Sequence, residues 1–208
     1  MQRITLRGGS SATYRSRSRS TNRNHLPRIV GVDDGAFSVV GDRAGKAILV
    51  VVLLKGSRIG SLKLGVIQID GVDACSVLSS LLKGFRYDVV MLSGISFAGF
   101  NLIDIKKLAQ HLHKPVIAVI REKPNNRAVR NALRKHFTDW RQRWAMVKHA
   151  GPLHSCKPVP DEPELYFEVR GGSPDFARLM IMASSFISRL PEPVRVAGIL
   201  AKSLRVAC

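Results

Sequence analysis

Cysteine is scarce in this chain of 208 residues. The three cysteines, Cys75, Cys156 and Cys208, lie far apart in the sequence. No Cys-x-x-Cys pair is present, and no Cys/His cluster has the spacing of zinc ligands. These absences exclude a disulfide-stapled scaffold and a structural zinc site, and they favour a reducing, intracellular compartment.

Long apolar runs are also missing. The longest, Ala47 to Leu54, is far shorter than the ~20 residues that a membrane-spanning helix needs. The N-terminus has no apolar stretch of the kind found in secretory signal peptides. A membrane-spanning protein and a secreted protein are therefore both disfavoured.

Acidic residues are few, because 15 Asp and Glu stand against 33 Lys and Arg, for a formal net charge of +18. Such an excess favours polyanionic partners, since each neutralised phosphate releases condensed counterions. Nucleic acid, either DNA or RNA, is the expected partner, and an anionic membrane is the rival that we set aside. A chain that merely tolerates its charge is the remaining alternative.

Residues 1–27 contain no acidic residue and are rich in Arg, Ser and Thr. This composition cannot bury enough apolar surface to offset the entropy lost on ordering, so it predicts a disordered basic tail. The tail would act either as an arm on the phosphate backbone or simply as a solvated extension. The folded domain is expected to span residues 28–208.

Short β-branched and aliphatic runs predict strands at 28–33, 47–54, 62–69, 88–92, 115–120 and 165–169. Apolar residues at helical spacing predict helices at 73–83, 101–111, 126–149, 174–188 and 193–205. Three early strands joined by short turns, followed by alternating helices and strands, are typical of the α/β ribonuclease H-like fold. That fold has a mixed sheet, three antiparallel strands then parallel βα units, with flanking helices. A doubly wound nucleotide-binding fold would need a crossover helix between the first two strands.

Two carboxylates end the first predicted strand. In the ribonuclease H-like architecture, carboxylates at strand ends hold two divalent cations that stabilise an in-line displacement at phosphorus. Asp33 is the candidate catalytic residue and metal ligand, and Asp34 is a further candidate ligand or a turn former beside Gly35. Adjacent strand residues point to opposite faces, so only one of the two can lead into a site. An Asp-Asp-Gly turn without chemistry is the alternative.

The fourth strand ends in Ser93 and Gly94, where a second carboxylate would be expected. Serine is a poor ligand for hard cations, so a two-metal site would lose a bridging charge. The loop from Ser93 to Asn101 lies at a strand's carboxyl end, where α/β sheets bind ligands. The nearest downstream carboxylate, Asp104, is a candidate catalytic residue. Its spacing from Asn101 also suits an N-cap and the third residue of a helix.

The segment 126–149 carries two stripes of side chains at helical spacing. An apolar and aromatic stripe, which we expect to face the core, comprises Val129, Leu133, Phe137, Trp140, Trp144 and Val147. A basic stripe, which is either a phosphate-binding face or a solvated one, comprises Arg127, Arg130, Arg134 and Arg141.

Three spaced motifs resemble a mainly archaeal family usually described as endonuclease V homologues. They are IVGVDDG at 29–35, LSGISFAGFN at 92–101 and LPEPVRVA at 190–197. The resemblance runs from about Arg28 to Leu204. It implies the ribonuclease H-like fold, a prokaryotic cytoplasm, and kinship with an endonuclease that uses Mg²⁺ (or Mn²⁺) and cuts nucleic acid near deaminated adenine.

By this resemblance Asp33 matches the first-strand metal ligand of endonuclease V, whereas Ser93 stands where an Asp is expected. The catalytic Glu that endonuclease V carries after its third strand has no clear counterpart among residues 71–82. Its catalytic His would fall near 171–172, where this chain has no His. One of four catalytic groups is thus retained. Two hypotheses follow: a metal-dependent nuclease that relies on Asp33 with Asp34 and Asp104, or a non-catalytic module that binds nucleic acid.

Overall fold

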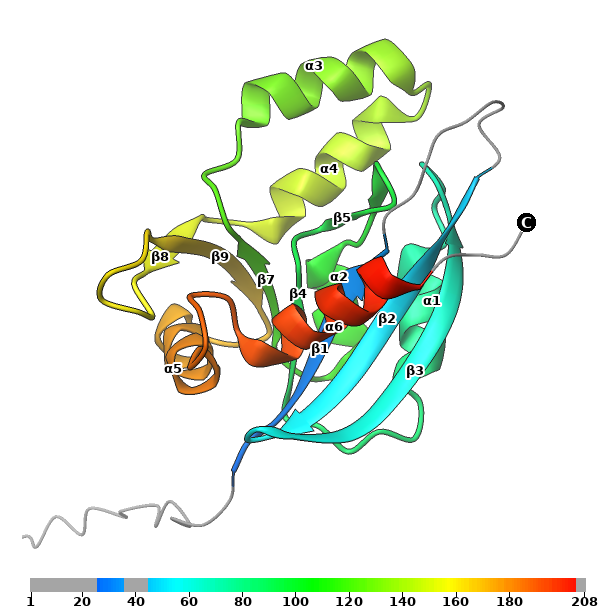
Figure 1. Ribbon diagram of the computed structural model, residues 1–208. Coiled ribbons are helices and arrows are strands. Elements are labelled where there is room, and N and C mark those ends of the chain that lie inside the picture. Colours follow the sequence, from blue (N-terminus) through cyan, green and yellow to red (C-terminus); the bar gives the residue numbers. More distant parts are fainter. Residues whose placement is uncertain (1–25, 36–44, 205–208) are drawn as a thin grey trace, which may run out of the picture.

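The computed structural model describes residues 26–35 and 45–204, so the predicted basic tail lies outside it apart from residues 26 and 27. The described chain forms strands and helices in a layered arrangement (Figure 1). The strands are β1 (Arg28–Asp34), β2 (Lys46–Lys55), β3 (Arg58–Gln68), β4 (Val89–Leu92), β5 (Ser96–Phe97), β6 (Asn101–Leu102), β7 (Val116–Ile120), β8 (His154–Cys156) and β9 (Leu165–Arg170). The helices are α1 (Ala74–Leu82), α2 (Ile105–Leu112), α3 (Asn126–His136), α4 (Trp140–Ala150), α5 (Pro174–Ser184) and α6 (Glu192–Ser203). No helix in the described ranges is long and apolar enough to cross a lipid bilayer.

Seven strands form one mixed sheet in the order β3-β2-β1-β4-β7-β9-β8. The first three strands are antiparallel neighbours, and β4 and β7 then run parallel to β1. This order confirms the predicted ribonuclease H-like sheet. The two remaining strands, β5 and β6, pair as a small separate hairpin after β4.

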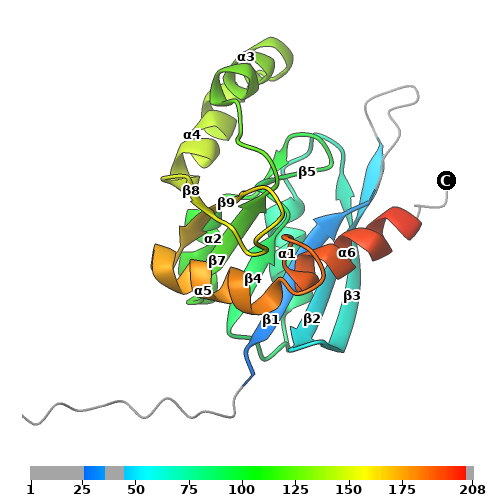
Figure 2. The same cartoon turned by 60° about the vertical axis from the view of Figure 1, so that its left-hand side comes forward.

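Helices cover both faces of the sheet, with α1 and α2 on one face and α5 and α6 on the other (Figures 1 and 2). Successive side chains of a strand point to opposite faces. Along β1, Val30 and Val32 therefore enter the core on the α1 and α2 side, and Ile29 enters the other core. Gly31 and Asp33 lie on the α6 side of the same strand.

The backbone of α6 lies directly against β1 because glycines leave no side chain between them. A Cβ atom placed on Gly31 would overlap the carbonyl group of Pro193. A Cβ atom on Gly35 would lie 2.7 Å from the carbonyl oxygen of Ala201. Such distances are shorter than real Cβ contacts, so this seam between strand and helix has room only for glycine.

The predicted single helix over 126–149 is wrong, because the chain forms α3 and α4 with a turn between them. Phe137 is extended at this turn, with φ −131° and ψ 129°. Its ring packs edge-on to Phe100 at 5.5 Å between centroids, and the Arg143 guanidinium lies 4.4 Å from its ring centre. Because the Phe100 ring belongs to a remote segment, helical periodicity alone does not reveal the break.

Other boundaries also differ from the prediction. The helix expected at 101–111 begins at Ile105, because Asn101 and Leu102 pair with β5 instead. The helix expected at 174–188 ends at Ser184. The strand over 165–170 is antiparallel to β7 rather than parallel, because the unpredicted strand β8 reverses the chain just before it.

A carboxyl group is buried on β9. Leu165 and Phe167 pack in the core beneath α5, so Glu168, which alternates with them, faces the side of α2 and α4. Its side chain is 8% exposed. Burial raises the pKa of Glu168 to about 7, and the charge of Arg170 opposes this rise.

The seam between β1 and α6 predicts a severe effect of Gly31→Ala. The added methyl group should force α6 away from the sheet and lower the free energy of unfolding by about 1–3 kcal/mol or more. Chemical denaturation measures the loss. Gly60→Ala is the matched control, because a Cβ atom there would lie an ordinary 3.6 Å from the carbonyl oxygen of Leu53. Equal stabilities of the two variants would contradict the close contact.

Glu168→Gln should change how stability depends on pH. The folded-state pKa of Glu168 is about 7, above the ordinary 4.5. Its contribution to the free energy of unfolding is therefore complete below pH 4.5 and is lost as the pH rises from there through 7. The neutral variant avoids this loss, so its advantage should grow to at most about 3 kcal/mol at alkaline pH. Urea unfolding on either side of neutrality tests this, and parallel pH profiles would contradict it.

Candidate functional site

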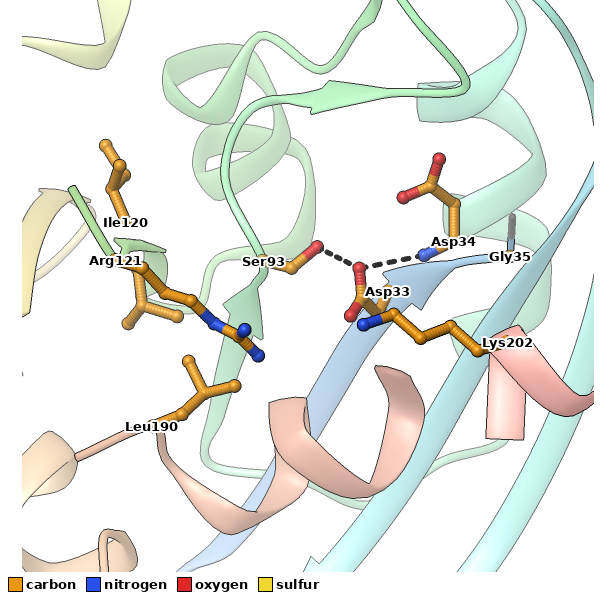
Figure 3. Close-up of a pocket in the computed structure, with 9 residues that line it drawn as sticks. Asp33, Asp34, Gly35, Ser93, Ile120, Arg121, Leu190 and Lys202 are labelled. Atoms are coloured by element: carbon orange, nitrogen blue, oxygen red, sulfur yellow. Dashed lines mark hydrogen bonds between the residues drawn. The ribbon is translucent and has the colours of Figure 1, made fainter. Parts of the chain in front are cut away.

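The carboxyl ends of β1, β4 and β7 meet at one edge of the sheet, where a cavity of about 410 Å³ opens (Figure 3). In open α/β sheets this is the edge that binds ligands. The predicted residues Asp33, Asp34 and Ser93 are brought together there. The full lining comprises Asp33, Asp34, Gly35, Ser93, Val119, Ile120, Arg121, Leu190 and Lys202.

Asp33 lies near the end of β1 with its side chain toward α6. Its Oδ1 atom accepts hydrogen bonds from the Ser93 hydroxyl at 2.5 Å and from the backbone N–H of Asp34 at 3.0 Å. Its Oδ2 atom lies so close to α6 that a Cβ atom on Gly198 would overlap it. Gly198 therefore shapes the site, although no motif in the sequence marks it.

Two cations accompany this carboxyl group. Arg121 directly follows β7, Lys202 lies in the last turn of α6, and both side chains extend toward Asp33 (Figure 3). Burial raises the pKa of Asp33 above its ordinary value. The hydrogen bonds from Ser93 and from the Asp34 backbone, and then the charges of Lys202 and Arg121, oppose that rise. Positive charge near Asp33 thus comes from the chain itself.

Sequence reasoning missed both cations. Arg121 could have been found, since it follows the predicted strand 115–120 and the carboxyl ends of parallel strands converge. Nothing in the sequence marks Lys202, because only the crossing of α6 over β1 brings it to the cavity.

Asp34 leaves β1 on the opposite side. Its Oδ2 atom accepts a hydrogen bond from the backbone N–H of Ala98 at 2.5 Å. Burial raises the pKa of Asp34, the hydrogen bond from Ala98 lowers it, and the negative charge of Asp33 raises it. Asp34 therefore ties the turn between β5 and β6 to the end of β1.

A hydrolytic two-cation centre needs several carboxylate oxygens around the metal ions. The acidic residues of the cavity lining are Asp33 and Asp34, and each has one oxygen already engaged by hydrogen bonds. Within residues 26–35 and 45–204, no group of three His, Cys, Asp or Glu side chains could hold a metal ion. The described residues do not fit the predicted Mg²⁺ or Mn²⁺ centre, because Ser93 supplies a hydroxyl where β4 would have to supply a carboxylate.

Asp104 does not line this cavity. Its Oδ1 atom accepts hydrogen bonds from the backbone N–H groups of Lys106 and Lys107, both at 3.1 Å, so Asp104 is itself the N-cap of α2. Its Oδ2 atom lies 2.7 Å from Nδ1 of His149 on α4. The side chain is 6% exposed. Both oxygens thus have structural partners, and the geometry does not bring Asp104 to Asp33.

The remaining loop residues have different environments. Asn101 is fully buried and links two elements: its Oδ1 accepts from the backbone N–H of Ala74, and its Nδ2 donates to the carbonyl oxygen of Gln68 at 2.9 Å. It therefore caps α1 rather than α2. Gly94 follows Ser93 with φ of 125°, a conformation that suits glycine, and it does not contribute to the cavity lining.

The four predicted nucleic-acid-binding arginines, Arg127, Arg130, Arg134 and Arg141, are all exposed on α3 and α4. The neighbouring apolar stripe was expected in the core, and that expectation is largely wrong. Leu133 is its one fully buried member, and Trp140 and Trp144 are half-buried. The arginines therefore share a surface with the tryptophans.

The sequence matches the pattern of the family described as Endonuclease dU over residues 25–205. The chain belongs to the Endonuclease dU family. A UPF0215 protein of Thermococcus gammatolerans is 40% identical over 185 residues, covering 85% of this chain and 91% of the relative. A UPF0215 protein of Methanopyrus kandleri is 36% identical over 178 residues, covering 84% and 89%. These relatives are archaeal, as the resemblance implied.

Solved structures show which fold this Endonuclease dU family member shares. A protein of unknown function from Archaeoglobus fulgidus superposes with a TM-score of 0.73 at 29% identity, covering 84% of this chain and 95% of that one. Endonuclease V of Bacillus subtilis gives 0.56 at 12%, covering 85% and 79%. Ciona intestinalis endonuclease V, in complex with inosine-containing DNA, gives 0.53 at 13%, covering 82% of each chain. The chain has the endonuclease V fold, which confirms the resemblance.

Because the wild-type cavity fits a metal ion poorly, we expect Ser93→Asp to create Mg²⁺ binding, since the new carboxylate would lie beside Asp33. Millimolar Mg²⁺ should then raise the melting temperature of the variant by about 3 °C, and that of wild type much less. Thermal denaturation with and without Mg²⁺ measures the shift, and Asp33→Asn in the Ser93→Asp background should abolish it. An equal shift in wild type would show that the cavity holds a cation without a second carboxylate.

Proposed function

We propose that this chain binds nucleic acid across the sheet edge that carries the Asp33 cavity, and that it does so without hydrolysing the bound strand. The observation that carries the proposal is the cavity itself. Among the described residues, its carboxylates are accompanied by Arg121, Lys202 and the hydroxyl of Ser93 instead of a set of metal ligands. Cationic side chains at this edge would hold a phosphate but would not replace two bound cations in activating water.

Charge supports the same partner. The chain carries a formal net charge of +18, and α3 and α4, which carry the exposed arginines, are the next two elements after β7, whose carboxyl end borders the cavity. We infer that Arg127, Arg130, Arg134 and Arg141 contact phosphates, each of which releases counterions and makes binding sensitive to salt. A structure with bound DNA is known for an endonuclease V of the same fold.

Metal-dependent cleavage is the second candidate. It is favoured by the position of Asp33 and Asp34 at the carboxyl end of β1 and by the description of the family as Endonuclease dU. Under this candidate Mg²⁺ or Mn²⁺ would be the cofactor, in a cytoplasmic enzyme acting on nucleic acid. Ligands beyond the described residues would then have to complete the site.

The test combines binding with cleavage. End-labelled DNA and RNA, each unmodified or carrying one inosine or one deoxyuridine, are incubated with wild type and Asp33→Ala in Mg²⁺ and in Mn²⁺. We expect salt-sensitive binding by both proteins and no cutting by either. Metal-dependent cutting that disappears in Asp33→Ala would overturn the non-hydrolytic proposal and establish the second candidate.

A paired charge variant tests where nucleic acid binds. Arg121→Ala with Lys202→Ala should weaken binding about tenfold and reduce its salt dependence, because two phosphate contacts are lost. Lys55→Ala with Arg58→Ala removes the same charge at the opposite end of the sheet, since Lys55 pairs with Arg28 at the start of β1. Equal weakening by both pairs would mean that binding depends on overall charge and not on the cavity.

A further inference from the structure

The hairpin formed by α3 and α4 has an unusual charge distribution. Between Asn126 and Ala150 there are seven Lys or Arg residues and one acidic residue, Asp139. That acid is bound to Arg143, with Nε 2.9 Å from Oδ1. The exposed cations of the hairpin therefore have no free acidic neighbour on it. The hairpin projects from the edge of the sheet (Figures 1 and 2).

Arginines and tryptophans interleave on this hairpin. The Arg141 and Arg134 guanidinium carbons lie 4.9 and 5.6 Å from the centre of the Trp140 ring. The Arg130 guanidinium carbon lies 5.8 Å from the centre of the Trp144 ring. Both tryptophans are half-buried and lie outside the buried core, whereas the three arginines are exposed. Planar cations and indole faces therefore form one mixed surface, here called the Arg-Trp stack.

The Arg-Trp stack is held in place relative to the cavity. Arg143, a buried residue of the same helix as both tryptophans, donates hydrogen bonds to the carbonyl oxygens of Asp70 at 3.0 Å and Phe100 at 2.5 Å. Phe100 belongs to the turn between β5 and β6, and the Ala98 backbone of that turn is bound by the carboxylate of Asp34. A continuous set of contacts therefore joins the cavity to the hairpin.

We propose that the Arg-Trp stack binds unpaired nucleotides, so that the chain prefers single-stranded to double-stranded nucleic acid. This inference rests on the proposed function and adds the class of strand. Bases that are not paired expose flat faces, which stack on indole rings and on guanidinium planes, while neighbouring arginines hold the phosphates. A duplex presents only its phosphates to such a surface, because its base faces are stacked on one another.

Intrinsic fluorescence tests the proposal directly, because Trp140 and Trp144 are the two tryptophans of the chain. A short single-stranded oligonucleotide should quench the tryptophan fluorescence of the full chain, and its duplex should not. Anisotropy of a labelled strand should show tighter binding of the single strand. Trp140→Leu with Trp144→Leu should weaken that binding about tenfold to a hundredfold. Phe186→Leu, at an aromatic residue 52% exposed between α5 and α6, is the control and should bind like wild type.

A charge-neutral substitution separates stacking from charge. Replacing Arg130, Arg134 and Arg141 with lysine keeps the net charge but removes the planar groups. We expect about tenfold weaker binding of the single strand and unchanged binding of the duplex. Circular dichroism of each variant confirms that it is folded.

The outcomes distinguish this inference from the proposed function. Equal binding of both strand forms without quenching would overturn the stacking site and leave nucleic-acid binding intact, as would lysine variants that bind like wild type. If the wild-type chain bound no oligonucleotide of either form, both the stacking site and the proposed nucleic-acid binding would be overturned. Quenching by anionic lipid vesicles, but not by any oligonucleotide, would instead assign the surface to a membrane.

Discussion

The contact between the backbones of α6 and β1 positions the whole site. Glycines at 31 and 35 on the strand side and at 198 on the helix side leave space for the two backbones to approach and for the Asp33 side chain between them. As a result, Lys202 in the last turn of α6 extends over the end of β1, and the Asp33 carboxylate is enclosed between sheet and helix. A wider separation would open the cavity to water and weaken the electrostatic interactions inside it.

Among the described residues, the cavity lining carries as many basic as acidic side chains. Two carboxylates, Asp33 and Asp34, lie with two cations, Arg121 and Lys202. Burial raises the pKa of both carboxyl groups, whereas hydrogen-bond donors lower the pKa of each, and the charges of Lys202 and Arg121 lower that of Asp33. The opposition of these effects suits a site that binds a polyanion through fixed cations, because a phosphate can contact Arg121 or Lys202 while the carboxylates remain hydrogen-bonded.

Arg143 makes the projecting hairpin part of the same structure. Burying a guanidinium group is costly unless its charge is paired and its N–H groups find hydrogen-bond acceptors. Here it pairs with Asp139, donates to backbone carbonyl oxygens in two loops and lies over the ring of Phe137. The hairpin is thus fixed at the edge that carries the cavity, and its exposed arginines and half-buried tryptophans are held in a defined position.

The sequence alone determined the antiparallel start of the sheet, the position of Asp33 at the end of the first strand and the basic face of residues 126–149. These features follow from local apolar periodicity and charge, which neighbouring residues carry. Tertiary structure decided the rest. In the folded chain Asp104 is a helix cap bound to His149, Asn101 caps a different helix, the long helix breaks at Phe137, and the tryptophans lie half-buried outside the core. The fold also brings Lys202 and Gly198 to Asp33. Each of these depends on contacts between segments remote in the chain, and such contacts leave no periodic signal in the sequence.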